Sequence, residues 1–567
     1  MKCTLTILSV CLAAVIDVIL AQKIPGITRI VSANGSLFVD ELGRSRIFRG
    51  TNVVYKAPPY VPDISMDAGS LLSFNQKDVT VLAKYGVTAI RLGILWAGVE
   101  PVRGQYNQTY LNQMMQIVQM CSDAGIYVLL DSHQDVFSEK YCGEGIPMWA
   151  NAQTKFNVFS FPVPLSLFPY TLTAAGTPSI SDCESKDFAI YQGSYEVSLA
   201  FQNLWDNANG MRDDFVNYWK VVAKAFLPFK NILGYDIINE PWNGDIFKNP
   251  LRADPIYANV HNLQPFYDAV SEGIRSIDPN AIIFFEPVAL SQAAVGFNSG
   301  PNGAGNATKN VLNFHYYSNV QLTSLNQTIN NRIQNAKALG VGVFMSEFES
   351  GIRAGPTAVV SNYQAADNAL MSILGWEYKE YIPTGMRIFT GTNDGLVDAH
   401  TGMVRQNMTG PYSRTTAHAI AGTPNLMLFD DATGRFHLEF SFNGRADVGG
   451  VTEIRTNVDT HYPSGYSMNV SSTSGSFIGL KDNSLSNNSI YVAPDPNNMP
   501  QAGASVVLVI VPTVASPLSP SAASAPSSAS TLTAQSPSNP AYNQATSKAL
   551  VLHFVSLITL VTPLICC

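Results

Sequence analysis

The chain has 567 residues, more than one typical domain, and 46% of them are hydrophobic, which is enough to fill a sizeable core. Its formal net charge is −8 and only 13% of its residues are charged, so no basic face predicts a nucleic-acid partner. We therefore expect two folded domains and an electrically neutral partner. The sequence does not determine the oligomeric state, and a monomer is the simplest expectation.

The first 21 residues have the pattern of a signal peptide. Lys2 precedes an apolar run from Leu5 to Ala21, and the small residue Ala21 stands where signal peptidase could cut. Seven Asn-X-Ser/Thr sequons are typical of glycosylated surface loops: Asn34, Asn107, Asn306, Asn326, Asn407, Asn469 and Asn487. We expect a protein of the secretory pathway, located outside the cell, at its surface or in a lysosome-like compartment.

Between residues 22 and 408, short apolar runs alternate with amphipathic segments. The eight runs are Arg46–Val53, Val87–Ile94, Ile126–Ser132, Ile232–Asn239, Ala281–Glu286, Val311–Tyr317, Val341–Glu347 and Ile373–Tyr378. Eight parallel strands with crossover helices close into a (β/α)₈ barrel, whose active site forms at the C-terminal ends of the strands. The first domain is therefore predicted to be a TIM barrel of the α/β class.

Two carboxylates stand at the ends of two of these runs. Glu240 follows the apolar stretch that ends in Asn239, and Glu347 closes the run that begins at Val341. A retaining glycosidase needs two such acids about 5–5.5 Å apart, one to protonate the leaving oxygen and one to attack the anomeric carbon. Other polar residues gather at the same strand ends: Arg91, His133, Asp135, Glu286, His315 and Tyr317. For Glu286 alone, a helix N-cap or a loop salt bridge is the better interpretation.

Three of the seven cysteines lie between the predicted signal peptide and the start of the C-terminal apolar tail. Cys142 and Cys183 flank a loop region rich in Gly, Pro and Ser, and we predict a disulfide between them. Cys121 lies in a helical apolar pattern and is predicted to be a buried small side chain. No CxxC or HExxH motif occurs, so neither a metal site nor an organic cofactor is predicted.

The texture of the sequence changes after about Thr409. Short β-rich runs, separated by Gly, Asn, Asp and Ser turns, predict a β-sandwich over residues 409–511: Leu426–Phe429, Arg435–Phe442, Gly449–Arg455, Tyr466–Val470 and Ser505–Val511. This module could bind substrate or membrane, but support of the barrel is the simpler interpretation.

The last 56 residues differ again in composition. Residues 512–548 are rich in Ser, Ala and Pro and predict an extended stalk, whereas residues 549–567 form an apolar tail. Small residues from Ser536 to Ala541 lie upstream of this tail at a spacing that resembles a GPI-attachment signal. A retained tail anchor or a secreted form cleaved in the stalk are the alternatives.

Four motifs lie at the ends of predicted barrel strands: Arg91-Leu92-Gly93, Asp131–Val136, Gly234–Trp242 and Met345–Phe348. Together they resemble glycoside hydrolase family five and, within it, the endoglycoceramidases. A fifth likeness is Ile420–Pro424, which leads into the β module. Asn-Glu-Pro alone is shared by many barrel glycosidases, but the His-Gln-Asp-Val segment and the Tyr-Asp…Asn-Glu-Pro-Trp context are more specific. The resemblance spans residues 45–460 and implies hydrolysis of the bond between oligosaccharide and ceramide in a glycosphingolipid.

The resemblance also implies residue roles. Glu240 would be the general acid/base and Glu347 the nucleophile, supported by five residues: Asn239, Arg91, His133, His315 and Tyr317. Trp376, Lys56 and Asp131 would contact the sugar. The substrate would lie at a membrane or micelle surface, and ceramide needs an apolar wall. The run Val158–Tyr170, in the insertion after the third strand, is a candidate that could equally pack on the barrel as local core.

Two features depart from the family pattern. Glu349 is a second acid shortly after the predicted nucleophile, where glycine is common, and the stretch Gly375–Tyr381 is unusually charged. The competing readings are a glucosylceramidase-like exo-glycosidase, a β-glucanase of the same barrel family, or an inactive glycolipid-binding lectin. A binding module has no chemical need for opposed acids, which argues against the lectin.

Overall fold

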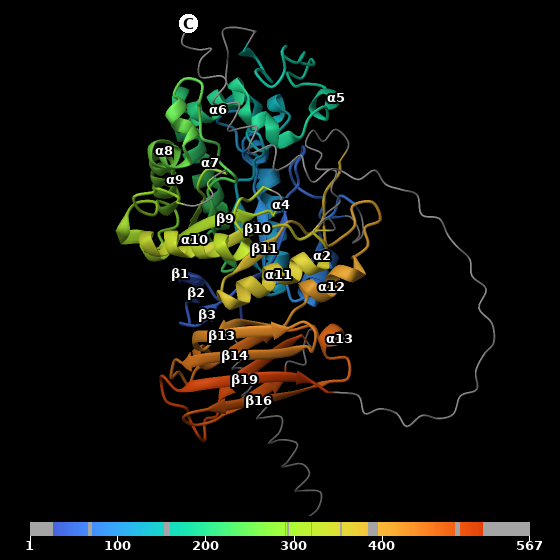
Figure 1. Ribbon diagram of the computed structural model, residues 1–567, viewed down its shortest axis with the longest axis vertical. Helices are drawn as coiled ribbons and strands as arrows, with labels where there is room; N and C mark the ends of the chain where they lie inside the picture. Colours follow the sequence, from blue (N-terminus) through green and yellow to red (C-terminus); the bar gives the residue numbers. More distant parts are fainter. Residues whose placement is uncertain are drawn as a thin grey trace, which may run out of the picture.

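The structure is a computed structural model in which a barrel stands on a β-sandwich (Figure 1). It describes residues 26–513 apart from 66–70, 152–158, 290, 292–293, 319, 352–353, 384–394 and 482–487. The predicted signal peptide, the apolar tail and all of the stalk beyond residue 513 lie outside the described residues. Among the described residues, no helix has both the length and the apolar composition needed to cross a bilayer.

Eight parallel strands close into the predicted barrel. They are β4 (Arg49–Val53), β5 (Ala89–Gly93), β6 (Tyr127–Asp131), β7 (Ile232–Asp236), β8 (Ile283–Phe285), β9 (Asn310–Tyr316), β10 (Gly342–Phe348) and β11 (Ile373–Gly375). Each strand overlaps one of the eight predicted runs, so the TIM-barrel prediction is confirmed. Strands β4 to β7 and β10 are buried at every residue, as expected where both faces of a parallel sheet are covered.

Helices connect the barrel strands and cover their outer faces (Figure 1). The longer ones are α2 (Gln76–Lys84), α4 (Gln108–Asp123), α6 (Tyr195–Trp205), α7 (Met211–Phe226), α9 (Gln264–Arg275), α10 (Leu325–Leu339) and α11 (Gly355–Asn368). Shorter ones are α3 (Trp96–Val99), α5 (Ile180–Cys183) and α8 (Pro255–Ala258). Two more helices lie beyond the last barrel strand: α12 (Gln406–Tyr412), and α13 (Val458–His461) in the C-terminal domain. Local sequence sets where they begin: at α2, the Asn75 side chain accepts the N–H of Lys77 while Asp78 accepts the N–H of Asn75.

An aromatic cluster lies at the N-terminal ends of the barrel strands. Phe38 packs against Phe48, Phe284 and Phe344, with ring centroids 5.5, 6.0 and 5.8 Å away. Phe38 belongs to the N-terminal hairpin of β1 (Ile30–Asn34) and β2 (Leu37–Asp40), which lies against the beginning of β10 through a bridge between Gly35 and Gly342. Polar side chains are thus left to the C-terminal ends of the strands, at the opposite end of the barrel.

Two antiparallel sheets form the sandwich. The seven-stranded sheet has the order β1-β2-β3-β12-β15-β18-β17 and the four-stranded sheet the order β13-β14-β19-β16. The remaining bounds are β3 (Ser45–Arg46), β12 (Thr416–Ile420), β13 (Gly422–Asp430), β14 (Arg435–Phe442), β15 (Thr452–Arg455), β16 (Tyr466–Ser472), β17 (Phe477–Lys481), β18 (Ser489–Pro494) and β19 (Ser505–Pro512). The five predicted runs match β13, β14, β15, β16 and β19. The segment assigned to the barrel supplies β1, β2 and β3, which sequence analysis did not place in this sheet.

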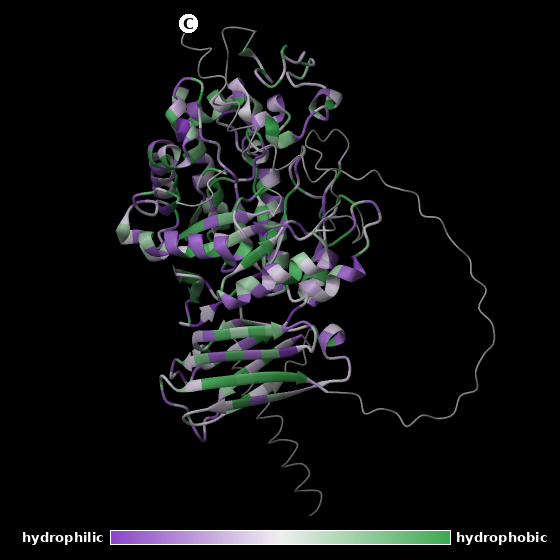
Figure 2. Ribbon diagram, in the orientation of Figure 1, coloured by the Kyte–Doolittle hydropathy of each residue, from purple (hydrophilic) through white to green (hydrophobic). Residues whose placement is uncertain are grey.

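The seven-stranded sheet is covered on both faces. Its strands β12 and β18 are buried at every residue, whereas β14 and β19 of the other sheet alternate between buried and more exposed positions. The central strand β19 is apolar along most of its length (Figure 2). On the barrel side, Arg46 donates to the Tyr127 hydroxyl at 2.8 Å, and Asn457 donates to the carbonyl of Lys84 at 2.8 Å. The sandwich is therefore fixed to the floor of the barrel, away from the catalytic end.

Candidate active site

The two predicted catalytic acids meet at the mouth of the barrel. Glu347 lies near the end of β10, and Glu240 lies four residues beyond β7. One carboxylate oxygen of each, together with a ring nitrogen of His315, lies within 4.8 Å of the others. Glu347 is buried, whereas the Glu240 side chain is 29% exposed. This spacing fits the separation of about 5–5.5 Å that a retaining double displacement requires.

Each oxygen of Glu347 is held by one short hydrogen bond. Arg91 donates from Nη1 to Oε1 at 2.6 Å, and the Tyr317 hydroxyl donates to Oε2 at 2.6 Å. Burial, and after it the charge of Glu347, raise the pKa of Tyr317 well above its usual value, so the phenol keeps the hydrogen that it donates. The carboxylate is consequently fixed in orientation.

Arg91 is a fully buried cation shared among several acids. Its Nε donates to Asp236 at 2.8 Å, and its Nη2 lies 2.9 Å from Asp131 and donates to the Asn239 side-chain oxygen at 2.9 Å. Burial would lower the pKa of Arg91, but the surrounding carboxylates raise it well above its usual value. Burial raises the pKa of Asp236 to about 8, although Arg91 opposes this shift. Asp236 therefore carries little charge at neutral pH, and this reduces the repulsion among the carboxylates that surround Arg91.

Glu240 contacts His315 and Glu286. His315 Nδ1 lies 2.7 Å from Glu240 Oε1, and the backbone N–H of Glu240 donates to Glu286 Oε2 at 3.2 Å. Glu240 has a φ of +39°, in the left-handed region that non-glycine residues rarely adopt. The interpretation of Glu286 as a loop salt bridge is wrong: it is 3% exposed and lies inside the site.

The predicted sugar-contacting residues lie on the other side of the mouth. Trp376 stacks on His133, with ring centroids 5.2 Å apart and planes at 14°, and Lys56 Nζ lies 4.6 Å from the Trp376 ring. Lys56 also forms an ion pair with Asp135. Asp131 differs from its prediction, because it is 0% exposed and pairs with His133 Nδ1 at 2.8 Å and with Arg91. It orients these two residues and presents no surface to a sugar.

The two departures from the family pattern have local explanations. The Glu349 carboxylate accepts a hydrogen bond from the Ser318 hydroxyl at 3.1 Å, away from the bonds that hold Glu347. In the charged stretch after β11, Lys379 is a buried anchor that lies 3.2 Å from Asp78 and donates to the Ser73 carbonyl at 2.7 Å. These charges fix the last barrel loop to α2.

Two groups of side chains in the described part of the chain have a spacing that suits a metal: Glu240, His315 and Glu347, and His133, Asp135 and Glu144. In the second group, the Lys56 ammonium already pairs with Asp135 and lies 3.7 Å from Glu144. In the first, the same atoms form the hydrogen bonds described above. Two-carboxylate hydrolysis uses neither group as a metal site.

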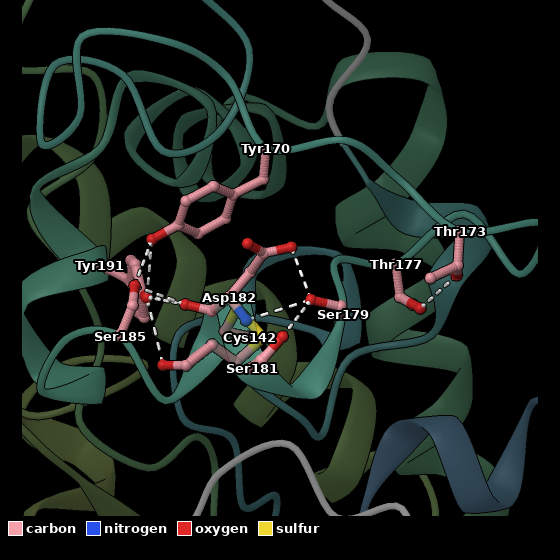
Figure 3. The surroundings of a disulfide bond; sticks show 10 residues. Cys142, Tyr170, Thr173, Thr177, Ser179, Ser181, Asp182, Ser185 and Tyr191 are labelled. Atoms are coloured by element: carbon pink, nitrogen blue, oxygen red, sulfur yellow. Dashed lines mark hydrogen bonds between the residues drawn. A yellow bond between two sulfur atoms is a disulfide. The ribbon is translucent and has the colours of Figure 1, made fainter.

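The predicted disulfide between Cys142 and Cys183 is confirmed, and Cys121 is buried as predicted. The disulfide links two points of the insertion that follows β6 (Figure 3). Nearby, the Tyr170 hydroxyl lies 2.8 Å from the Ser185 hydroxyl and 3.2 Å from that of Tyr191. The insertion is therefore a tethered structure rather than a loose loop.

The insertion combines a local core with an exposed apolar tip. Phe161 is 2% exposed and packs against the rings of Tyr141, Tyr170 and Tyr191. The tip residues Leu167 and Phe168 are 92% and 76% exposed. The local-core alternative is thus confirmed for Phe161, and the apolar wall for ceramide stays a prediction. Val158 lies outside the described residues.

Comparisons with known proteins agree with this geometry. Residues 61–381 match the family model for cellulase (glycosyl hydrolase family 5), and residues 414–503 match the glycoside hydrolase family 5 C-terminal domain. An endoglycoceramidase of Cyanea nozakii is 36% identical over 76% of this chain and 85% of that relative. An endoglycoceramidase of Hydra vulgaris is 34% identical over 77% of this chain and 82% of that relative.

A solved structure has the same fold. Endo-glycoceramidase II from a Rhodococcus species, in its ganglioside GM3 complex, superposes with a TM-score of 0.62 at 19% identity. The superposition covers 85% of this chain and 100% of that chain, so the likeness includes both domains. The family model covers most of the barrel, and the two endoglycoceramidases align with about three quarters of this chain. The chain therefore belongs to glycoside hydrolase family 5.

Proposed function

We propose that this enzyme is a retaining endo-glycosidase that hydrolyses the β-glycosidic bond between oligosaccharide and ceramide in glycosphingolipids. The observation that carries the retaining mechanism is the pair Glu240 and Glu347, with oxygens within 4.8 Å across the barrel mouth. The names of the two relatives above supply the substrate class. The proposed double displacement requires no cofactor.

In the first step, the Glu347 carboxylate attacks the anomeric carbon while Glu240 gives its proton to the ceramide oxygen. Ceramide leaves, and the sugar remains bound to Glu347 as an ester. Arg91 and Tyr317 keep the attacking oxygens aimed, because each binds one of them at 2.6 Å. Trp376, stacked on His133, offers a flat face for the sugar ring, and Lys56 offers donors to its hydroxyl groups.

In the second step, Glu240 takes a proton from a water molecule, which attacks the anomeric carbon from the face that ceramide has left. Two displacements restore the β configuration and release the intact oligosaccharide. The Asn239 amide nitrogen donates one hydrogen to the Gln134 carbonyl at 3.0 Å and has a second for the sugar 2-hydroxyl. That bond strengthens as the oxocarbenium-like transition state develops.

Product analysis tests this function. The purified enzyme is incubated with mixed gangliosides in detergent, and the sugar and lipid products are identified by mass spectrometry. Intact oligosaccharide and ceramide are expected, whereas glucose as the sole sugar product would point to an exo-glycosidase. The control is Glu347→Gln, which should lose turnover but retain glycolipid binding; turnover equal to that of the parent would refute the assignment.

The proposed reaction takes place at a membrane or micelle surface, with the insertion tip in contact with lipid. No Asp, Glu, Lys or Arg occurs between Lys155 and Asp182, and Leu167 and Phe168 are the most exposed large apolar side chains of this stretch among the described residues. The insertion follows β6 and His133, which lies two residues beyond the end of that strand, so it rises from the catalytic end of the barrel (Figure 1). Burial of a large apolar side chain in lipid contributes about 1.5–3 kcal/mol.

The tip is tested by comparing two substrates. The double variant Leu167→Ser, Phe168→Ser should hydrolyse glycolipid in vesicles at least about tenfold more slowly, because roughly 1.4 kcal/mol of lost binding corresponds to a factor of ten. Its rate on a soluble aryl lactoside should stay unchanged. The matched control is Leu251→Ser, a 62% exposed apolar residue elsewhere on the surface. Equal losses on both substrates would count against lipid contact.

We place the enzyme in the secretory pathway, at the cell surface through a GPI anchor. The Cys142–Cys183 disulfide suits an oxidising compartment, and the sequon residues Asn34, Asn326 and Asn469 are exposed. Release of the enzyme from intact cells by phosphatidylinositol-specific phospholipase C tests the anchor; a retained protein would indicate the tail-anchor alternative.

A further inference from the structure

Glu286 lies behind the catalytic acids, and its described side-chain partners are hydrogen-bond donors. Its Oε2 accepts the backbone N–H of Glu240 at 3.2 Å, and its Oε1 accepts the Asn313 amide at 3.2 Å. Arg91 Nη2 lies 3.7 Å from Oε1. Because the Glu240 N–H and the Asn313 amide both donate, both oxygens of Glu286 act as hydrogen-bond acceptors.

This carboxylate determines which nitrogen of His315 carries a hydrogen. His315 Nε2 lies 3.1 Å from Glu286 Oε1, so Nε2 must be protonated to face that oxygen favourably. The other nitrogen, Nδ1, lies 2.7 Å from Glu240 Oε1 and 3.5 Å from Glu347 Oε2. With Nε2 protonated, a proton between Nδ1 and Glu240 can lie on either atom. The two residues therefore share one exchangeable proton.

We propose that Glu286 is a positioning residue that makes His315 a proton store for the catalytic acid Glu240. Before bond cleavage, the Glu240–His315 pair holds one proton in addition to the Nε2 hydrogen. That proton passes to the leaving oxygen in the first displacement. It is replaced by a proton from water in the second, so the pair returns to its starting state. This inference rests on the proposed glycosidase function.

Two further observations support this role. Burial would lower the pKa of His315, but Glu286 and Glu347, with the hydrogen bonds to Glu240 and Glu286, raise it well above its usual value. The charged groups that face the ring come from three strands: Glu240 beyond β7, Glu286 beyond β8 and Glu347 on β10. Glu286 also binds the N–H of Glu240, whose φ of +39° needs support from its surroundings.

The first test is the pH profile of kcat and kcat/KM on a soluble aryl lactoside. Glu286→Gln should move the basic limb down by about one pH unit, since a nearby opposite charge shifts a pKa by roughly 1–3 units. It should lower kcat about tenfold or more while KM changes less than about twofold, because Glu286 does not touch the sugar. The matched control is Asp278→Asn, a buried acid before the start of β8 that binds the Tyr235 hydroxyl at 3.2 Å, and its basic limb should stay in place.

The second test does not need activity. In protein labelled with ¹⁵N-histidine, the His315 ring should titrate at a pH lower by about one unit in Glu286→Gln than in the parent. If Glu286→Gln fails to fold, Glu286→Asp keeps the charge and should keep the basic limb while lowering kcat. An unmoved limb and an unmoved His315 titration would make Glu286 purely structural. Absence of glycoside hydrolysis by the parent, with the titration shift intact, would instead reject the proposed function alone.

Discussion

Removal of the Tyr317 hydroxyl should expose how the second displacement depends on a single hydrogen bond. This hydroxyl donates to Glu347 Oε2 at 2.6 Å, whereas His315 Nδ1 lies 3.5 Å from that oxygen. A hydrogen bond to a charged group contributes about 1.5–3 kcal/mol. In Tyr317→Phe this corresponds to roughly a 10- to 150-fold lower rate for a step that needs the bond in its transition state.

Loss of this bond should slow the second displacement more than the first. Glu347 is already an anion before the first displacement, so the bond stabilises both the ground state and the transition state there. In the second displacement the carboxylate leaves the sugar and regains its charge, and the donor stabilises the transition state relative to the ester. The glycosyl-enzyme should therefore accumulate, and KM should fall together with kcat.

Stopped-flow release of nitrophenol from an aryl lactoside measures this effect. Tyr317→Phe should give a burst approaching one equivalent, and intact-protein mass spectrometry should detect the covalent sugar. Tyr316→Phe, the preceding residue on β9, is the matched control and should show neither change. A variant that keeps its kcat, or that loses kcat with no burst and no adduct, would refute the reasoning.

Three other predictions follow from the site, the insertion and the domain interface. Glu240→Gln should lower glycolipid hydrolysis by about 10²–10⁴-fold but affect hydrolysis of a dinitrophenyl lactoside far less, because that leaving group needs no proton. Added azide should restore turnover and give a glycosyl azide as the product. Equal losses on both substrates would contradict the role of Glu240 as a general acid. Joint replacement of Cys142 and Cys183 by Ser opens a loop with a sequence separation of 41. The free energy of unfolding should fall by about 4 kcal/mol by the chain-entropy relation, and the insertion should become sensitive to protease. An unchanged rate of digestion would contradict this prediction. Burial alone would raise the pKa of Glu453, but Arg455 and the other cationic neighbours of Glu453 lower this pKa from 4.5 to about 2. The ionised carboxylate therefore stabilises the folded state fully above pH 4.5, and this contribution is lost as the pH falls through 2. Guanidinium unfolding should show that the free energy of unfolding of Glu453→Gln lacks this acid-dependent loss, which amounts to roughly 3 kcal/mol in the parent.

Sequence patterns predicted the parts of the molecule whose signal is local. Each barrel strand is a short apolar run, and Glu240 and Glu347 stand where such runs end. The role of Glu286 could not be read in this way, because a strand-end acid looks the same in sequence whether it joins a loop salt bridge or a catalytic network. Asp131 was assigned to the sugar for the opposite reason: its motif resembles that of the family, but its complete burial appears only when His133 and Arg91 surround it.

Long-range pairing was the other part that local patterns could not supply. β3 has only two residues, Ser45 and Arg46, and it pairs with β2 on one side and with the distant β12 on the other. Nothing in a two-residue segment marks it as a strand, so the N-terminal hairpin was counted with the barrel. The sandwich was consequently predicted without three of the strands that join it to the barrel floor.

The pairing of Ser45 with Ile420 constrains how the protein is made. The ribosome synthesises Ser45 long before Ile420, and at about 5–20 residues per second the first partner waits roughly 20–75 seconds for the second. During that delay the free edge of β3 is open to wrong partners, including other nascent chains. A transcript truncated before β12 would leave this edge permanently uncovered, so a shortened enzyme that keeps every catalytic residue should still aggregate in the cell.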